Sequence, residues 1–153
     1  MSFLVSLLEP PAPDLHKKSR AMGISVAAAF IIAIIAVWFV LRFYSEKKAA
    51  AEFFNAVVAG DMTRAYQLWK PSPTYRMQDF LADWGPTGYY GPVKSYEIVK
   101  AKSPTGSATS VEIRVAISPF SPMPGANDPE KSQKTKIVTV WVDSRDKSFS
   151  FPP

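Results

Sequence analysis

Residues 21–41 read AMGISVAAAFIIAIIAVWFVL and contain neither a charged residue nor a proline. A helix of that length rises about 1.5 Å per residue and reaches roughly 31 Å, close to the hydrocarbon thickness of a bilayer. A buried helix of a water-soluble protein normally keeps a polar face, and this stretch has none. The aromatic residues that follow as far as Tyr44 are typical of a membrane–water boundary. The sequence therefore predicts one transmembrane helix over residues 21–44, preceded by an N-terminal tail over residues 1–20.

A cleaved signal peptide is the main alternative for this stretch. Its apolar part would be about 7–15 residues long, with small residues at a cleavage site close behind it. The apolar run here is longer, and the nearest triplet of small residues, residues 49–51, lies behind Arg42, Lys47 and Lys48. We therefore expect an uncleaved anchor in the cell (inner) membrane. Basic residues are balanced across the two flanks, and the α-amino group and His16 favour a cytoplasmic N-terminus with the C-terminal domain on the extracytoplasmic side.

Composition excludes several kinds of chemistry. Cysteine is absent, and the single histidine, His16, lies in the tail. These facts exclude disulfides, thiol catalysis and iron–sulfur ligation, and they exclude a histidine-based dyad or metal site in the C-terminal domain. The net charge is +5, but the basic residues are scattered along the sequence without a basic, aromatic-rich stripe. We expect no nucleic-acid partner, no cofactor and no metal.

Three helices are predicted after the span. No glycine or proline occurs from residue 24 to residue 59, so the span is expected to continue as helix into residues 49–58, with no flexible linker between membrane and domain. Apolar residues at helical spacing form the face of that extension that should be buried; they are Ala50, Phe53, Phe54, Val57 and Val58. Gly60 is a natural stop and Asp61 a natural N-cap for a helix over residues 62–69. A further helix is predicted over residues 77–84.

The pattern then changes to strands, which are predicted over residues 96–102, 109–118, 136–143 and 148–151. In the second of these, apolar and polar residues alternate as one buried face requires. The third is nearly continuous in apolar content and is expected to be central. Residues 119–135 are rich in proline and predict a long exposed loop. The fold class predicted is α+β: one transmembrane helix, then a small domain, residues 45–153, of about three helices packed on a four-stranded antiparallel meander.

Residues 53–61, FFNAVVAGD, and residues 65–69, AYQLW, combine an aromatic helix, a Gly-Asp break and an Ala-Tyr helix. This combination resembles membrane-anchored bacterial members of the nuclear transport factor 2-like group, cone-shaped α+β domains that include ketosteroid isomerases. The resemblance covers roughly residues 46–151 and implies the fold, whereas the periplasmic location expected for the domain follows from the charges that flank the span. Catalytic members of the group use acid–base residues inside the cone. No residue of this chain matches such a motif, so the resemblance implies no catalytic residue here.

Carboxylates are the candidates for acid–base chemistry. Asp79 and Asp83 stand four residues apart on one helix and would share a face, as paired carboxylates require. The apolar residues of that helix define a different face, so we expect both aspartates to point to water. Asp61 is expected to be a cap rather than a base. Asp128 and Glu130 lie in the proline-rich loop, where we expect them to be solvated.

Aromatic residues offer a second type of site. They would line a cone-shaped pocket or form the core of the domain, and we favour the core; the residues are Trp69, Tyr75, Trp84, Tyr89, Tyr90, Tyr96 and Trp141. The loops at residues 87–92 and 119–129 are the best candidates for a protein-contact surface, because rigid aromatic and proline-rich segments lose little entropy on binding.

Two weaker features point to partners. The apolar patch over residues 3–8 is either part of a disordered tail or a docking segment. Small residues repeat every four positions at Ser25, Ala29 and Ala33, which permits close helix packing in lipid. The function expected is that of a non-catalytic accessory or structural subunit of a larger membrane complex, with the bilayer and other membrane-protein subunits as partners. The alternative is a membrane-anchored module that binds a small apolar ligand in its cone, and an enzyme is the least favoured.

Overall fold

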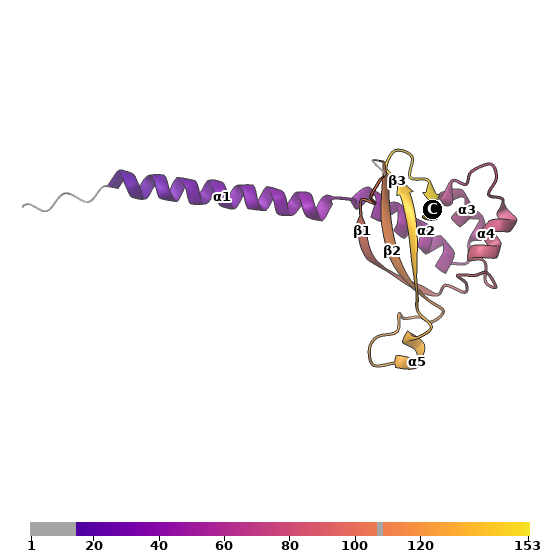
Figure 1. Cartoon of the computed structure of the whole chain (residues 1–153). Coiled ribbons are helices and arrows are strands. Elements are labelled where there is room, and N and C mark those ends of the chain that lie inside the picture. Colours follow the sequence, from indigo (N-terminus) through magenta and orange to yellow (C-terminus); the bar gives the residue numbers. More distant parts are fainter. Residues whose placement is uncertain (1–14, 107–108) are drawn as a thin grey trace, which may run out of the picture. The chain divides into compact units, whose positions relative to one another are not determined.

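The computed structural model describes residues 15–106 and 109–153 (Figure 1). The chain divides into two compact units, Met1–Arg42 and Phe43–Pro153, and each is described by itself. The apolar patch over residues 3–8 lies outside the described residues.

The first unit contains one long helix, α1 (Leu15–Leu41). Where its side chains are described, over residues 26–38 and at Leu41, all of them are exposed. Among the residues that the structure describes, no helix is long and apolar enough to cross a membrane. The predicted span over residues 21–44 includes residues 21–25, 39 and 40, whose side chains lie outside the described part, so the span stays a prediction.

The expected continuous helix from the span into the domain is wrong. Helix α1 ends at Leu41 and α2 (Tyr44–Val58) begins three residues later, after Phe43 with φ 63° and ψ 16°. A right-handed helix cannot contain this left-handed conformation. The sequence shows no breaker here; instead, the Phe43 side chain packs against the hydrophobic core of the second unit. Burial of this ring offsets the cost of the break, and local sequence patterns do not reveal it.

The other helices begin and end as predicted. In α2 the buried face includes Phe53, Phe54 and Val57, whereas Val58, predicted on that face, is exposed. Gly60 adopts φ +75°, and the Asp61 carboxylate accepts a hydrogen bond from the Arg64 N–H at 3.0 Å. This cap starts α3 (Met62–Trp69), and α4 (Met77–Trp84) follows.

Four strands form one antiparallel sheet in the order β1-β2-β3-β4, as predicted; they are β1 (Ser95–Lys102), β2 (Ser110–Ser118), β3 (Lys136–Asp143) and β4 (Phe149–Ser150). Ile113 of β2 pairs with Val140 of β3, and both are fully buried. Strand β3 is interior to the sheet, but only one face of it is buried. Between β2 and β3, the loop predicted to be irregular contains a one-turn helix, α5 (Pro129–Ser132).

The core lies between the sheet and α2, with α3 and α4 on the same side of the sheet (Figure 1). Phe53 is fully buried, and its ring lies 5.2 Å from the rings of Trp69, Trp84 and Phe149, measured between centroids. One side chain of α2 therefore contacts α3, α4 and β4.

Replacing Phe53 with alanine should lower the free energy of unfolding by about 3–5 kcal/mol, because it leaves a cavity among these rings. Unfolding of the full chain in mild detergent, followed by tryptophan fluorescence, measures the change. Val99→Ala is the control, since Val99 is exposed and its truncation should cost less than about 0.5 kcal/mol. An equal decrease in the free energy of unfolding for Phe53→Ala and Val99→Ala would contradict this account of the core.

Candidate functional site

The two loops that the sequence singled out meet at one end of the sheet. Lys136, the first residue of β3, donates a hydrogen bond from Nζ to the backbone oxygen of Tyr89 at 2.8 Å. Ser95, the first residue of β1, donates from Oγ to the backbone oxygen of Phe120 at 2.5 Å. Because β1 and β3 both begin at this end and β2 finishes there, the meander brings together segments that are far apart in the sequence. We call this region the loop surface and define it by Tyr89, Tyr90, Phe120, Lys131, Lys134 and Lys136.

Local packing holds the first loop in place. The Tyr90 ring stacks on the buried Trp84 ring, with centroids 4.8 Å apart. A Cβ on Gly91 would lie 1.9 Å from the backbone oxygen of Gly85, so only glycine fits where the loop crosses itself. Tyr89, next to the anchored Tyr90, is 72% exposed. The loop thus presents one aromatic ring to solvent from a fixed backbone.

Lysine side chains surround the aromatic rings of the loop surface. The Nζ atoms of Lys131 and Lys134 lie 5.8 and 5.7 Å from the centroid of the Phe120 ring, and Nζ of Lys136 lies 5.4 Å from that of Tyr89. These distances are within the range of cation–π attraction. Lys131 is also paired with Asp128 at 2.8 Å. Beside them is a cavity of about 240 Å³, lined in part by Tyr90, Pro119 and Lys134.

The candidate carboxylate pair is not a free pair. Asp79 is exposed, as predicted, and accepts a hydrogen bond from the backbone N–H of Arg76 at 2.9 Å. Asp83 was predicted to point to water, and this is wrong: it is half-buried and accepts a hydrogen bond from the Tyr75 hydroxyl at 2.6 Å. Burial and the Asp83 carboxylate raise the pKa of Tyr75 well above its ordinary value, so the phenol keeps its proton and remains a donor. Both aspartates are engaged in local structure.

The remaining candidate carboxylates either cap a helix or face solvent. Asp61 caps α3, as predicted. Asp128 caps α5 through the Lys131 N–H at 3.3 Å, and hydrogen bonding to Lys131 lowers its pKa. Its carboxylate is hydrogen-bonded and paired with Lys131, but the side chain stays 41% exposed, and Glu130 is exposed as expected. Within the described ranges, no three acidic or histidine side chains gather into a group that could hold a metal ion.

Most of the candidate aromatic residues belong to the core. Trp69 and Trp84 are buried, and the side chains of Tyr75, Tyr90 and Tyr96 are partly buried against the core. The core prediction is wrong for Tyr89, which is exposed. It is also wrong for Trp141, which alternates with the inward-facing valines of β3 and lies half-buried on the opposite face of the sheet.

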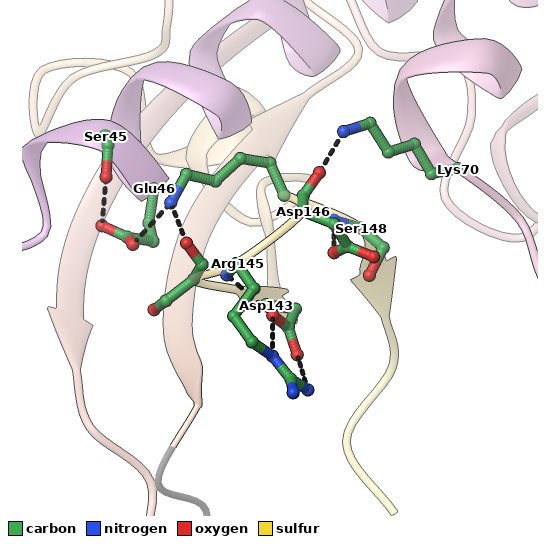
Figure 2. Close-up of polar contacts among 9 residues, drawn as sticks. Ser45, Glu46, Lys70, Asp143, Arg145, Asp146 and Ser148 are labelled. Atoms are coloured by element: carbon green, nitrogen blue, oxygen red, sulfur yellow. Dashed lines mark hydrogen bonds and ion pairs between the residues drawn. The ribbon is translucent and has the colours of Figure 1, made fainter.

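A second polar cluster, which sequence reasoning missed, lies where β3 ends (Figure 2). Glu46, in the first turn of α2, is 6% exposed and accepts hydrogen bonds from Nζ of Lys147 at 2.9 Å and from the Ser45 hydroxyl at 3.0 Å. Lys147 belongs to the turn between β3 and β4 and also donates to the Ser144 backbone oxygen at 2.5 Å. Because 101 positions separate Glu46 and Lys147, no local pattern predicts their pairing.

Opposing effects act on the ionisation of Glu46. Burial favours the neutral acid and raises the pKa of Glu46, whereas hydrogen bonds from Lys147, the backbone and Ser45 favour the carboxylate. The hydrogen bonds outweigh burial, and the pKa of Glu46 lies below its ordinary value of 4.5. The pair therefore joins α2 to the β3–β4 turn as long as Glu46 is ionised.

A groove lies beside this pair. Its volume is about 470 Å³, and residues of three separate segments line it: Tyr44, Ser45, Lys48, Ala49, Glu52, Leu68, Lys70, Lys147 and Phe149. The apolar residues among them come from α2, α3 and β4. The lysines come from α2, from the end of α3 and from the β3–β4 turn.

The stabilisation from the Glu46–Lys147 pair should be present above the ordinary pKa of a glutamate and should be lost as the pH falls through the lower pKa of folded Glu46. At neutral pH, Glu46→Gln should lower the free energy of unfolding by about 2 kcal/mol, because Lys147 loses its charged partner. The free energy of unfolding of the wild type and of Glu46→Gln is measured from neutral to acidic pH. The difference in this free energy between the two proteins should become smaller in acid. A difference that is independent of pH would contradict the pairing.

No protein-family model, curated protein or solved structure matches this chain. The α+β architecture is established by the helices and the antiparallel sheet, and the resemblance to nuclear transport factor 2-like domains stays an expectation.

Proposed function

We propose that this chain is a single-pass membrane protein whose domain serves as a non-catalytic accessory subunit of a larger membrane-protein complex. Residues 21–41 would anchor it in the bilayer, since Phe43 packs against the core of the second unit, and the loop surface would contact the partner. The observation that carries the proposal is the uninterrupted apolar run over residues 21–41.

Exposure along α1 supports the anchor. Ile31, Ile32, Ile34 and Ile35 are 49–66% exposed and, at 100° per residue, cover about 160° of the helix circumference. The rest of the circumference is apolar as well, because every residue from 26 to 38 is apolar and exposed. Leaving such side chains in water forfeits about 1.5–3 kcal/mol for each one that burial would cover. A helix that is apolar on all sides is suited to lipid or to the interior of a helix bundle.

The hydrogen bonds of the candidate carboxylates support a non-catalytic domain. A general acid or base needs a proton-transfer group that faces a substrate. Asp61, Asp79 and Asp128 cap helices or turns, and Asp83 is bound by Tyr75. The domain contains no histidine or cysteine that would replace them.

The loop surface supports a protein partner with acidic side chains. It combines an exposed aromatic ring on a fixed backbone with lysines of the β2–β3 connection and of the first position of β3. Tyrosine is enriched at protein interfaces, and complementary charge steers association. This region has three lysines and only two neighbouring acids, Asp128 and Glu130. Asp128 is paired with Lys131, so Lys134 and Lys136 keep the region positively charged.

Alkaline carbonate extraction of membranes tests the anchor. The full chain should stay in the membrane pellet, whereas a chain without residues 21–41 should be found in the supernatant. Release of the full chain by carbonate would overturn the membrane part of the proposal.

Native gel electrophoresis of membranes solubilised in mild detergent tests the partner. The double variant Lys134→Glu/Lys136→Glu should shift the protein from a large complex to its own size, because both changes bring negative charge to the loop surface. The control Arg64→Glu/Lys100→Glu makes the same charge change at exposed positions of α3 and β1, outside the loop surface, and should leave the complex intact. Migration of the wild-type chain as a lone monomer would contradict the subunit function.

A further inference from the structure

The groove beside the Glu46–Lys147 pair has two kinds of lining. Its apolar part is formed by Ala49, Leu68 and Phe149, and its basic part by Lys48, Lys70 and Lys147. The stems of lysine side chains extend apolar surface while their ammonium groups reach the rim. The groove is therefore suited to a ligand with an apolar body and an anionic group.

Backbone conformation singles out the same place. Among the described residues, three that are not glycine have positive φ: Phe43 (63°), Lys70 (51°) and Lys147 (61°). Lys70 and Lys147 line the groove, and Phe43 directly precedes Tyr44, which also lines it. Lys70 is the left-handed C-cap of α3, and Lys147 closes the β3–β4 turn with its N–H bonded to the Asp143 oxygen. The backbone of a helix end and of a tight turn therefore fixes where these two lysine side chains begin.

The charges around the groove limit the ligand. Lys147 is already paired with Glu46 at 2.9 Å, and Glu52 contributes one acid to the lining. Lys70 directs Nζ toward the backbone oxygen of Asp146, a neutral acceptor (Figure 2). Lys48 and Lys70 therefore supply the positive charge that is not paired with Glu46, and Glu52 reduces the remaining net charge of the lining to +1. Two lysines suit a single phosphodiester better than a highly charged anion.

Chain geometry brings a phosphodiester within reach. Tyr44 is the third residue after Leu41, the end of the apolar run, and three residues span at most about 11 Å. The polar headgroup layer extends roughly 5–8 Å beyond the hydrocarbon on each side of a bilayer. Tyr44 therefore lies at most about 11 Å from the end of the apolar run, a distance comparable with the thickness of the headgroup layer.

We propose that this groove binds the phosphate of an anionic phospholipid, with Lys48 and Lys70 as its ligands and the apolar lining against the glycerol end of the lipid. The inference rests on the proposed function, because it needs the membrane anchor. It assigns the domain a lipid-binding site at the opposite end of the sheet from the loop surface.

The test uses the full chain in vesicles of zwitterionic phosphatidylcholine, with and without an anionic phosphatidylglycerol. After extraction in mild detergent, native mass spectrometry measures which lipid stays bound. The wild type should retain the anionic lipid in preference to the zwitterionic one. Lys48→Gln/Lys70→Asn should reduce this preference by about fivefold for each lysine removed. Asparagine is chosen at position 70 because it tolerates the left-handed conformation.

The control variant Lys94→Gln/Lys100→Gln removes the same charge from exposed positions elsewhere in the domain and should retain the wild-type preference. A further arm adds inorganic phosphate to the chain in phosphatidylcholine vesicles, and it should neither bind tightly nor displace the lipid. Displacement by inorganic phosphate would overturn the lipid as the ligand.

The result also separates this inference from the proposed function. The groove site would be overturned if both double variants lost the preference for the anionic lipid equally. It would also be overturned if the wild-type chain resisted carbonate extraction but retained both lipids equally. Either outcome would leave the membrane anchor unaffected. A chain that fails to insert into vesicles would overturn both.

Discussion

The aromatic face of α2 is the interaction on which the domain depends. Helices α3 and α4 are each eight residues long, too short to be stable in water without tertiary contacts. They are held because Trp69 and Trp84 pack against Phe53, which also contacts Phe149 of β4. The inner valines and isoleucines of the sheet are covered by the same helix. One amphipathic helix thus joins two marginal helices to a sheet that would otherwise expose its apolar face.

This arrangement gives the domain two different ends. At one end, Glu46 of α2 pairs with Lys147 of the β3–β4 turn, and the groove lies next to them. At the other end, the loops before β1 and after β2 gather around Tyr89 and Phe120. An antiparallel meander produces this separation because successive turns alternate between the two ends of the sheet. A domain of this size therefore has room for two independent contact surfaces.

The fold gives the charged residues their neighbours. Lys131, Lys134 and Lys136 are already close in the sequence, and the fold places their ammonium groups against the rings of Phe120 and Tyr89 at the loop surface. Most of the candidate carboxylates, in contrast, accept hydrogen bonds within the domain, either from backbone N–H groups or from the Tyr75 hydroxyl. The loop surface thus presents lysines to its surroundings, while Asp61, Asp79 and Asp128 stabilise helix ends.

The sequence by itself determined the order and type of nearly every element. Helical spacing located Phe53, Phe54 and Trp84 on buried faces, Asp61 marked the start of α3, and alternation marked β2. These signals are local, because each depends on residues within a few positions of one another. The tertiary structure alone decided the break at Phe43, the exposure of Tyr89, the Tyr75–Asp83 contact and the Glu46–Lys147 pair. Each of these depends on packing or on partners brought together by the fold, and a periodic pattern carries no information about which distant side chain will be the neighbour.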